Sequence, residues 1–205
     1  MLIPLYKNYP ESYATFYDLV KAGHNASQMG FHVNTDEVYR FTNRFRVARA
    51  FLGIKLDDYA PNTIIGYDSL FKVFLAYSAF ELFLKMVGQT QSTIMGMLTP
   101  YNPAKHIAFV LKNDKGRKFY TFVYRHLDRP NHKQNLADIY NGISQNITYV
   151  ASSIRHIFAH GHLSAHANQC DPLAVKEICD KIFDFHMKVM DDEFSKVVRT
   201  YRSSI

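Results

Sequence analysis

The sequence predicts an all-α protein: an antiparallel helical bundle of about four main helices, preceded by an N-terminal helical extension. Apolar residues recur at spacings of three and four in every long segment, the period of one buried helical face, and two-residue alternation is scarce. Signals for helix starts and stops flank these segments. With 205 residues, 47% of them hydrophobic, the chain is long enough for one sizeable core.

The extension is predicted to contain two helices. The first covers residues 10–22 and ends at Gly23, and the second covers residues 34–53. Asn34, followed three residues later by Glu37, resembles a capping box. The arginines of the second helix point in several directions, which favours a solvated surface over a phosphate-binding edge; they are Arg40, Arg44, Arg46 and Arg49.

A connection is predicted over residues 57–67, which contain Pro61 and Gly66. It is the expected boundary between the N-terminal extension, residues 1–60, and the helical bundle domain, residues 61–205.

The most apolar helix is predicted over residues 68–87, ending at Gly88. Its apolar residues cover more than one stripe, so burial on two sides is expected. Glu81 and Lys85 stand out among its charged residues, at an i,i+4 spacing. They can pair on the solvent side, or Glu81 can point inward and orient an arginine or histidine of a functional site.

Two shorter helices follow in the prediction. The first covers residues 104–112. The second covers residues 118–124, which are rich in strand formers, although Phe119, Phe122 and Val123 also fit helical spacing. A helix is preferred there because the rest of the chain is helical.

A long apolar helix is predicted from about Asn135 to His160. Its buried face comprises Ile143, Ile147, Val150, Ile154, Ile157 and Phe158. Gly161 is placed to end the helix as a left-handed residue, so His160 falls in the last turn, where free carbonyls and the helix dipole favour a protonated imidazole. Arg155 lies about 140° from His160 around an ideal helix, so one straight helix does not put both on one face.

The last helix is predicted to begin at Asp171-Pro172 and to extend to about Tyr201. Aspartate accepts hydrogen bonds from the first free amides, and proline is tolerated at the first helical position. This helix can support the helix that carries Arg155 and His160 over its whole length.

Arg155, four intervening residues and His160 resemble the Arg-x4-6-His motif of the HEPN superfamily, small helical domains that include many metal-independent ribonucleases of toxin and defence systems. The residue after the arginine is often Asn, Asp or His in that family, and His156 fits. The resemblance covers roughly residues 68–200. It implies a metal-independent RNA endonuclease of a toxin–antitoxin or defence type, with RNA as substrate and an antitoxin or other protein as partner.

Such cleavage requires a base for the 2′-hydroxyl, an acid for the leaving oxygen and positive charge against the phosphorane. His160 is the expected base or acid, and Arg155 the expected charge stabiliser. His156 can bind substrate, supply the second proton-transfer group or face outward. A symmetric homodimer is also predicted, because a two-fold axis would let both copies of Arg155 and His160 converge on one phosphate.

Two alternatives remain open at this segment. Arg155 and His160 can form an ordinary polar cap, in a non-catalytic HEPN-like module that binds nucleotides, nucleic acid or a protein partner. A metal centre is the other alternative, since His160, His162 and His166 have the spacing HxHxxxH. Gly161 breaks the helix within that set and no acidic ligand lies beside it, so neither a metal nor a cofactor is expected.

The composition sets the remaining bounds. The net charge of +6 permits an anionic partner such as RNA without requiring one. Cys170 and Cys179 are too few for a disulfide framework. No segment reaches the ~18 apolar residues needed to span a bilayer, and no signal peptide is evident, so no membrane association and a cytoplasmic location are expected.

Overall fold

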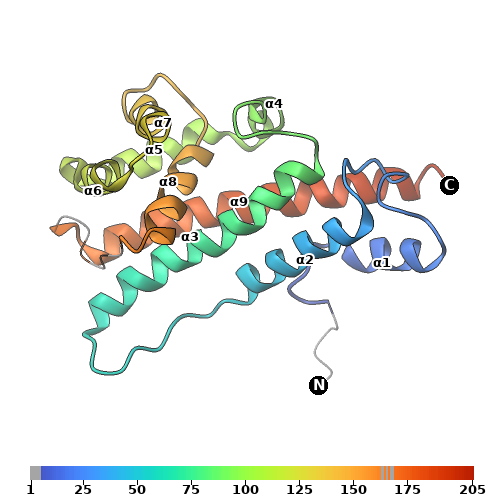
Figure 1. Cartoon of the computed structure of the whole chain (residues 1–205), viewed down its shortest axis with the longest axis horizontal. Helices are drawn as coiled ribbons and strands as arrows, with labels where there is room; N and C mark the ends of the chain where they lie inside the picture. The colour runs from blue at the N-terminus through green and yellow to red at the C-terminus, as the bar shows by residue number, and fades with distance from the viewer. Residues whose placement is uncertain (1–5, 163, 165, 167–168) are drawn as a thin grey trace.

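The computed structural model describes residues 6–162, 164, 166 and 169–205. These ranges contain helices and connections but no strand, which confirms the predicted all-α fold (Figure 1). The α-helices are α1 (Tyr13–Lys21), α2 (Thr35–Ala50), α3 (Pro61–Met86), α4 (Met95–Leu98), α5 (Pro103–Asn113), α6 (Lys118–His126), α7 (Pro130–Tyr140), α8 (Thr148–Ala159) and α9 (Pro172–Arg202). Short 3₁₀ turns cover Thr99–Tyr101 and Lys115–Arg117. None of the described helices has the length and apolar content needed to cross a lipid bilayer.

The two longest helices, α3 and α9, lie side by side and run in the same direction (Figure 1). Lys72 of α3 pairs with Asp180 of α9, and five residues further along α3 the Tyr77 ring contacts His186. The antiparallel arrangement therefore does not hold for this central pair. A parallel pair is possible because the chain between the two helices is long enough to return through α4 to α8. Helices α2 and α8 run opposite to α3, on different sides of it.

The N-terminal helices share the core of the bundle. Phe16 of α1 and Phe41 of α2 both contact Phe194 of α9, and Phe41 also contacts Phe83 of α3. These buried rings belong to one hydrophobic cluster with the interior of α8. The non-helical connection 51–60 lies at the predicted boundary, but apolar burial continues across it.

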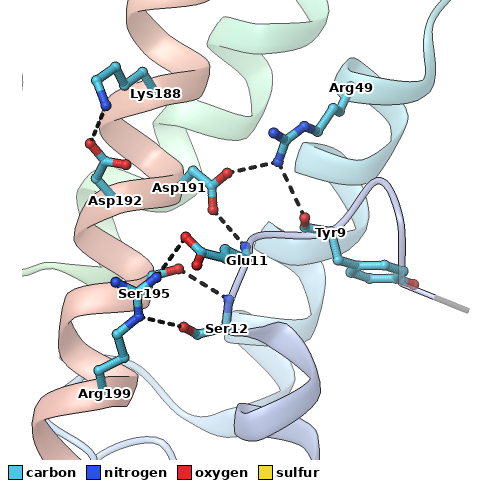
Figure 2. Close-up of polar contacts among 9 residues, drawn as sticks. All are labelled: Tyr9, Glu11, Ser12, Arg49, Lys188, Asp191, Asp192, Ser195 and Arg199. Atoms are coloured by element: carbon cyan, nitrogen blue, oxygen red, sulfur yellow. Dashed lines mark hydrogen bonds and ion pairs between the residues drawn. The ribbon is translucent and has the colours of Figure 1, made fainter. Parts of the chain in front are cut away.

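A polar network, which we call the N-terminal clamp, fastens the segment before α1 to α2 and α9 (Figure 2). Its members are Glu11, Ser12, Arg49, Asp191, Ser195 and Arg199. The Asp191 carboxylate accepts from the Arg49 guanidinium at 2.7 Å and from the Glu11 backbone N–H at 2.7 Å. Arg199 pairs with the Glu11 carboxylate at 2.6 Å. Segments more than a hundred residues apart in sequence are thereby joined.

Helix α3 begins seven residues earlier than predicted, at Pro61. Proline at the first helical position is preset in φ and lacks an N–H that would have no partner there, so Pro61 starts the helix rather than marking a connection. Gly66 lies inside α3 and is buried. The predicted connection over residues 57–67 is therefore wrong in its second half.

The long helix predicted from Asn135 to His160 is wrong, because α7 and α8 are separate helices. Gly142 adopts a positive φ of 73°, and its N–H donates to the Ile139 carbonyl. The next N–H, of Ile143, donates to the Asp138 carbonyl. This pair of bonds is a Schellman motif, which ends α7. Ile143, predicted to be buried, is 74% exposed.

Other predicted helix signals are confirmed. Asn34 and Glu37 form both hydrogen bonds of a capping box at the start of α2. Residues 118–124 are helical, as part of α6. The Asp171 side chain accepts from the Leu173 N–H at the start of α9.

Candidate functional site

Both ends of α8 are fixed by hydrogen bonds. Before the first turn, the Asn146 side chain accepts from the Thr148 N–H and donates to the Gln91 carbonyl in the connection after α3. At the other end Gly161, with φ of 76°, donates to the Phe158 carbonyl, and the His162 N–H donates to the Ile157 carbonyl. This second Schellman motif confirms Gly161 as the stop of the helix. These hydrogen bonds hold α8 at both ends and fix its position and rotation in the fold.

Arg155 lies on the face of α8 that packs against α3. Its guanidinium Nη2 is 3.3 Å from the Glu81 carboxylate, and both side chains are partly exposed. Glu81 thus contacts Arg155, as one of its two alternatives expected, but its side chain is partly exposed and does not point into the core. The Tyr77 hydroxyl is close by: burial and the Glu81 charge raise the pKa of Tyr77, and Arg155 opposes this rise. The Arg155 Nε is buried and has no hydrogen-bond partner among the described residues.

His156 lies on another face of α8 and its side chain is only 6% exposed. Its Nε2 lies 2.5 Å from Oδ1 of Asp128, in the connection between α6 and α7. A carboxylate only accepts, so the imidazole N–H donates to it. Asp128 itself is 63% exposed in its side chain. The hydrogen bond from His156 and the nearby His160 hold the pKa of Asp128 below its ordinary value.

His160 is the C-cap residue of α8 and is exposed. Its ring centroid lies 4.4 Å from the His156 ring. The His132 ring of α7 also contacts His156, edge to face, at 4.9 Å. The rings of His126 and His162 stack at 4.6 Å. Half of the ten histidines thus gather where α6, α7 and α8 meet.

We call these five imidazoles and Asp128 the histidine cluster: His126, Asp128, His132, His156, His160 and His162. Sequence spacing did not identify His126, Asp128 or His132, because the three come from different segments and no spacing along one helix relates them to His156. The one available signal was the high density of histidine between residues 126 and 162.

Burial and neighbouring positive charge act together inside the histidine cluster. Burial lowers the pKa of His132, and the nearby His156 lowers it further. Burial likewise lowers the pKa of His126, with a contribution from His162. The His132 Nδ1 is buried and, within the described chain, has no hydrogen-bond partner. The neutral form is therefore favoured for these two imidazoles.

The structure separates Arg155 from His160 much as the helical geometry predicts. Arg155 contacts Glu81 of α3, whereas His160 contacts His156 on the side of Asp128. The Arg155 charge still reaches His132, whose pKa it lowers slightly. The two groups flank one end of α8 without sharing a contact.

The alternative metal set of His160, His162 and His166 is not assembled. His162 stacks on His126, and the His166 Nε2 lies 3.3 Å from the Thr63 hydroxyl. Among the described residues, the side chains that converge to metal-ligand separations are Asp128, His156 and His160, whose ligand atoms all lie within 4.8 Å of one another.

This end of the molecule therefore offers a buried imidazole oriented by a carboxylate, an exposed imidazole beside it and a guanidinium on the adjoining face. Imidazoles transfer protons near neutral pH, and a guanidinium binds phosphate oxygens in a bidentate manner. Comparisons of this chain with protein-family models, with curated protein sequences and with solved structures found no match.

Proposed function

We propose that this protein is a metal-independent RNA endonuclease of the toxin–antitoxin or defence type that the HEPN resemblance implies. The observation that carries the proposal is the pair of imidazoles at the end of α8. Buried His156 is oriented by Asp128, exposed His160 lies beside it, and Arg155 precedes them on the same helix. Acid–base groups next to a fixed positive charge are what cleavage of RNA through its own 2′-hydroxyl requires.

The roles follow from exposure and contacts. His160 is exposed and can reach a substrate, so we assign it proton transfer to or from the reacting oxygens. His156 is buried and hydrogen-bonded to Asp128, so we assign it the positioning of His160 and a share in proton transfer. Arg155 is partly exposed and stabilises the negative charge that develops on phosphorus-bound oxygens.

We propose that the site is completed in a homodimer, because Arg155 and His160 of one copy face different sides of α8. An exposed apolar surface beside Phe158 of α8 supports this arrangement. It is a hollow formed by Ile54, Leu56, Tyr59, Tyr67, Phe71 and Phe158. Leu52, close to it in sequence, is 99% exposed. A second copy seated there would bring two α8 helices, each with its Arg155, close to one another.

The decisive experiment is cleavage of a labelled single-stranded RNA in EDTA. The wild-type protein is expected to cut this RNA and to leave the same sequence with 2′-O-methyl groups intact, because the internal nucleophile is then blocked. His160→Ala and Arg155→Ala are each expected to lose about 10²-fold or more in rate. His166→Ala is the matched control, an exposed imidazole outside the histidine cluster, and should retain activity. Full activity of the double variant Arg155→Ala/His160→Ala would refute the proposal.

The dimer has its own test. Sedimentation should give a dimer for the wild-type chain and a monomer for Tyr59→Asp, which places a charge on the exposed apolar surface. A wild-type chain that sediments as a monomer at the concentrations where it cuts RNA would contradict the composite site.

A non-catalytic module that binds nucleotides, nucleic acid or a protein partner is the second candidate. One observation favours it: Glu81 already neutralises the Arg155 guanidinium. In that case the wild-type chain would bind RNA in fluorescence anisotropy without cutting it, and Glu81→Gln would tighten binding by freeing the positive charge.

A further inference from the structure

We infer that Asp128, His156 and His160 form a binding site for a divalent transition-metal ion of the zinc type. Their three potential ligand atoms lie within 4.8 Å of one another. One comes from the connection between α6 and α7 and two come from the end of α8, so the fold and not local sequence brings them together. This set differs from the HxHxxxH spacing in two of its three members.

The distances suit a small four-coordinate ion. Ligand atoms about 2 Å from a tetrahedral zinc lie roughly 3.3 Å from one another. The Asp128 to His156 separation of 2.5 Å would have to widen, and the widest separation in the set would have to shorten. Both adjustments fall on exposed groups, because Asp128 is in a connection and His160 is the C-cap residue. The buried His156 can keep its place.

The donor atoms select the class of metal. Two imidazole nitrogens and one carboxylate oxygen suit Zn²⁺ and Co²⁺, whereas Mg²⁺ and Ca²⁺ prefer oxygen ligands. Three protein ligands leave one position for water. The edge-to-face packing of His132 against His156 restrains the buried ring, and a restrained ligand loses less freedom when an ion binds.

The inference has a regulatory consequence, which rests on the proposed function. A metal ion bound to His160 would occupy the nitrogen that the proposed cleavage uses for proton transfer. Zinc would therefore inhibit cleavage instead of supporting it.

The test is metal binding by the full-length chain after removal of metal with a chelator. Calorimetry with Zn²⁺ and visible absorption with Co²⁺ should show one site per chain. Asp128→Asn and His160→Ala change exposed residues, and each should weaken binding at least about tenfold, since loss of even an outer partner of a ligand has that effect. His162→Ala and His166→Ala are the matched controls and should bind as the wild type does.

The outcomes separate the inference from the proposed function. Unchanged affinity in Asp128→Asn and His160→Ala would overturn the site, and loss in the two controls would transfer it to the HxHxxxH set. Binding needs no RNA, so an inactive protein that binds Zn²⁺ through Asp128 and His160 supports the site while contradicting the nuclease. If the chain cuts RNA, its activity should fall over the Zn²⁺ range in which calorimetry shows binding. Activity unaffected by a saturated site would overturn the inhibitory role.

Discussion

The N-terminal clamp and the histidine cluster are both polar networks that join distant segments, but their charges are arranged differently. In the clamp, positive and negative groups alternate: Arg49 meets Asp191, and Arg199 meets Glu11 (Figure 2). In the histidine cluster, Asp128 is the one carboxylate beside His156 and His160, and the other three imidazoles each contact a further histidine ring. Two buried nitrogens beside α8, in Arg155 and His132, have no partner among the described residues.

From this difference we expect the clamp to stabilise the fold and the histidine cluster to serve the proposed function. Each charged side chain of the clamp is paired with one of opposite charge. Crowded imidazoles disfavour one another's protonated form, and pKa values perturbed in this way are common at functional sites. The four experiments that follow test this contrast, starting with the largest expected effect.

One arginine from each region gives the most direct test. Arg155→Ala is expected to lower RNA cleavage by about 10²-fold or more. Its unfolding free energy should change by less than about 1 kcal/mol, because the Glu81 pair is partly exposed. Arg199→Ala should leave cleavage unchanged, since Arg199 contacts only the clamp. Cleavage assays and urea denaturation of both variants are the measurements. Equal loss of cleavage in both would remove the distinction between the regions.

A histidine outside both regions supplies a reference for the effect of pH. His186 of α9 is fully buried against Phe80 and Tyr77 of α3, with His106 of α5 facing it, and its Nδ1 bonds the Ile182 carbonyl. Burial lowers the pKa of His186 from 6.5 to about 4. The unfolded chain therefore takes up a proton more readily than the folded chain does between these two values.

Stability should accordingly be complete above pH 6.5 and fall as the pH decreases towards about 4, by roughly 3 kcal/mol from His186. Urea denaturation across this range measures the loss. His186→Leu should flatten the profile, and the residual slope then reports the other histidines. A profile with the same slope in this variant would show that His186 does not cause the loss.

Two neighbouring aspartates of α9 test the clamp itself (Figure 2). Asp191→Ala removes the partner of Arg49 and of the Glu11 N–H, and its side chain is mostly buried. We expect a loss of about 1–3 kcal/mol in unfolding free energy. Asp192→Ala is the control, because Asp192 makes only an exposed i,i+4 pair with Lys188 and should cost about 0.5 kcal/mol or less. Similar losses of unfolding free energy in both variants would show that the clamp contributes no more to stability than an exposed ion pair does.

The smallest expected effect on stability is that of Asp128→Asn. The asparagine oxygen can still accept from His156, and Asp128 is exposed, so the urea midpoint should stay close to that of the wild type. The same variant should lose much of its affinity for Zn²⁺. A large fall in the urea midpoint would show that Asp128 mainly stabilises the fold, as the residues of the clamp do.

Much of the fold was predictable because its signals are local. The capping box of Asn34 and Glu37, the Asp171-Pro172 start and the Gly161 stop each act within one helical turn. The missed break between α7 and α8 was also local, since Asn141-Gly142 is a turn dipeptide. The single predicted helix continued the apolar spacing of α8 towards the N-terminus through Gly142, and this spacing was given more weight than the turn signal.

The candidate site was only half predictable, for a different reason. Arg155, His156 and His160 share one helix, so a motif can include all three. Asp128 and His132 reach His156 only through the packing of the connection after α6 and of α7 against α8. No sequence period links such residues. The contact between Glu81 and Arg155 agrees with one of the two alternatives in its partner, but the carboxylate is partly exposed and not directed inward as that alternative required.

The connection between α2 and α3 makes the molecule a natural candidate for fragment reassembly. Residues 51–60 contain no helix, and Leu52 projects fully into solvent, whereas α2 and α3 on either side pack into one core. A peptide-bond cut within 55–58 would break no helix, so the pieces 1–56 and 57–205, expressed as separate chains, should recombine into a stoichiometric, helical complex. With two separate chains, isotope labels or fluorophores could be placed on either side of the junction. The affinity of one fragment for the other would then measure how strongly the shared hydrophobic core holds the two fragments together.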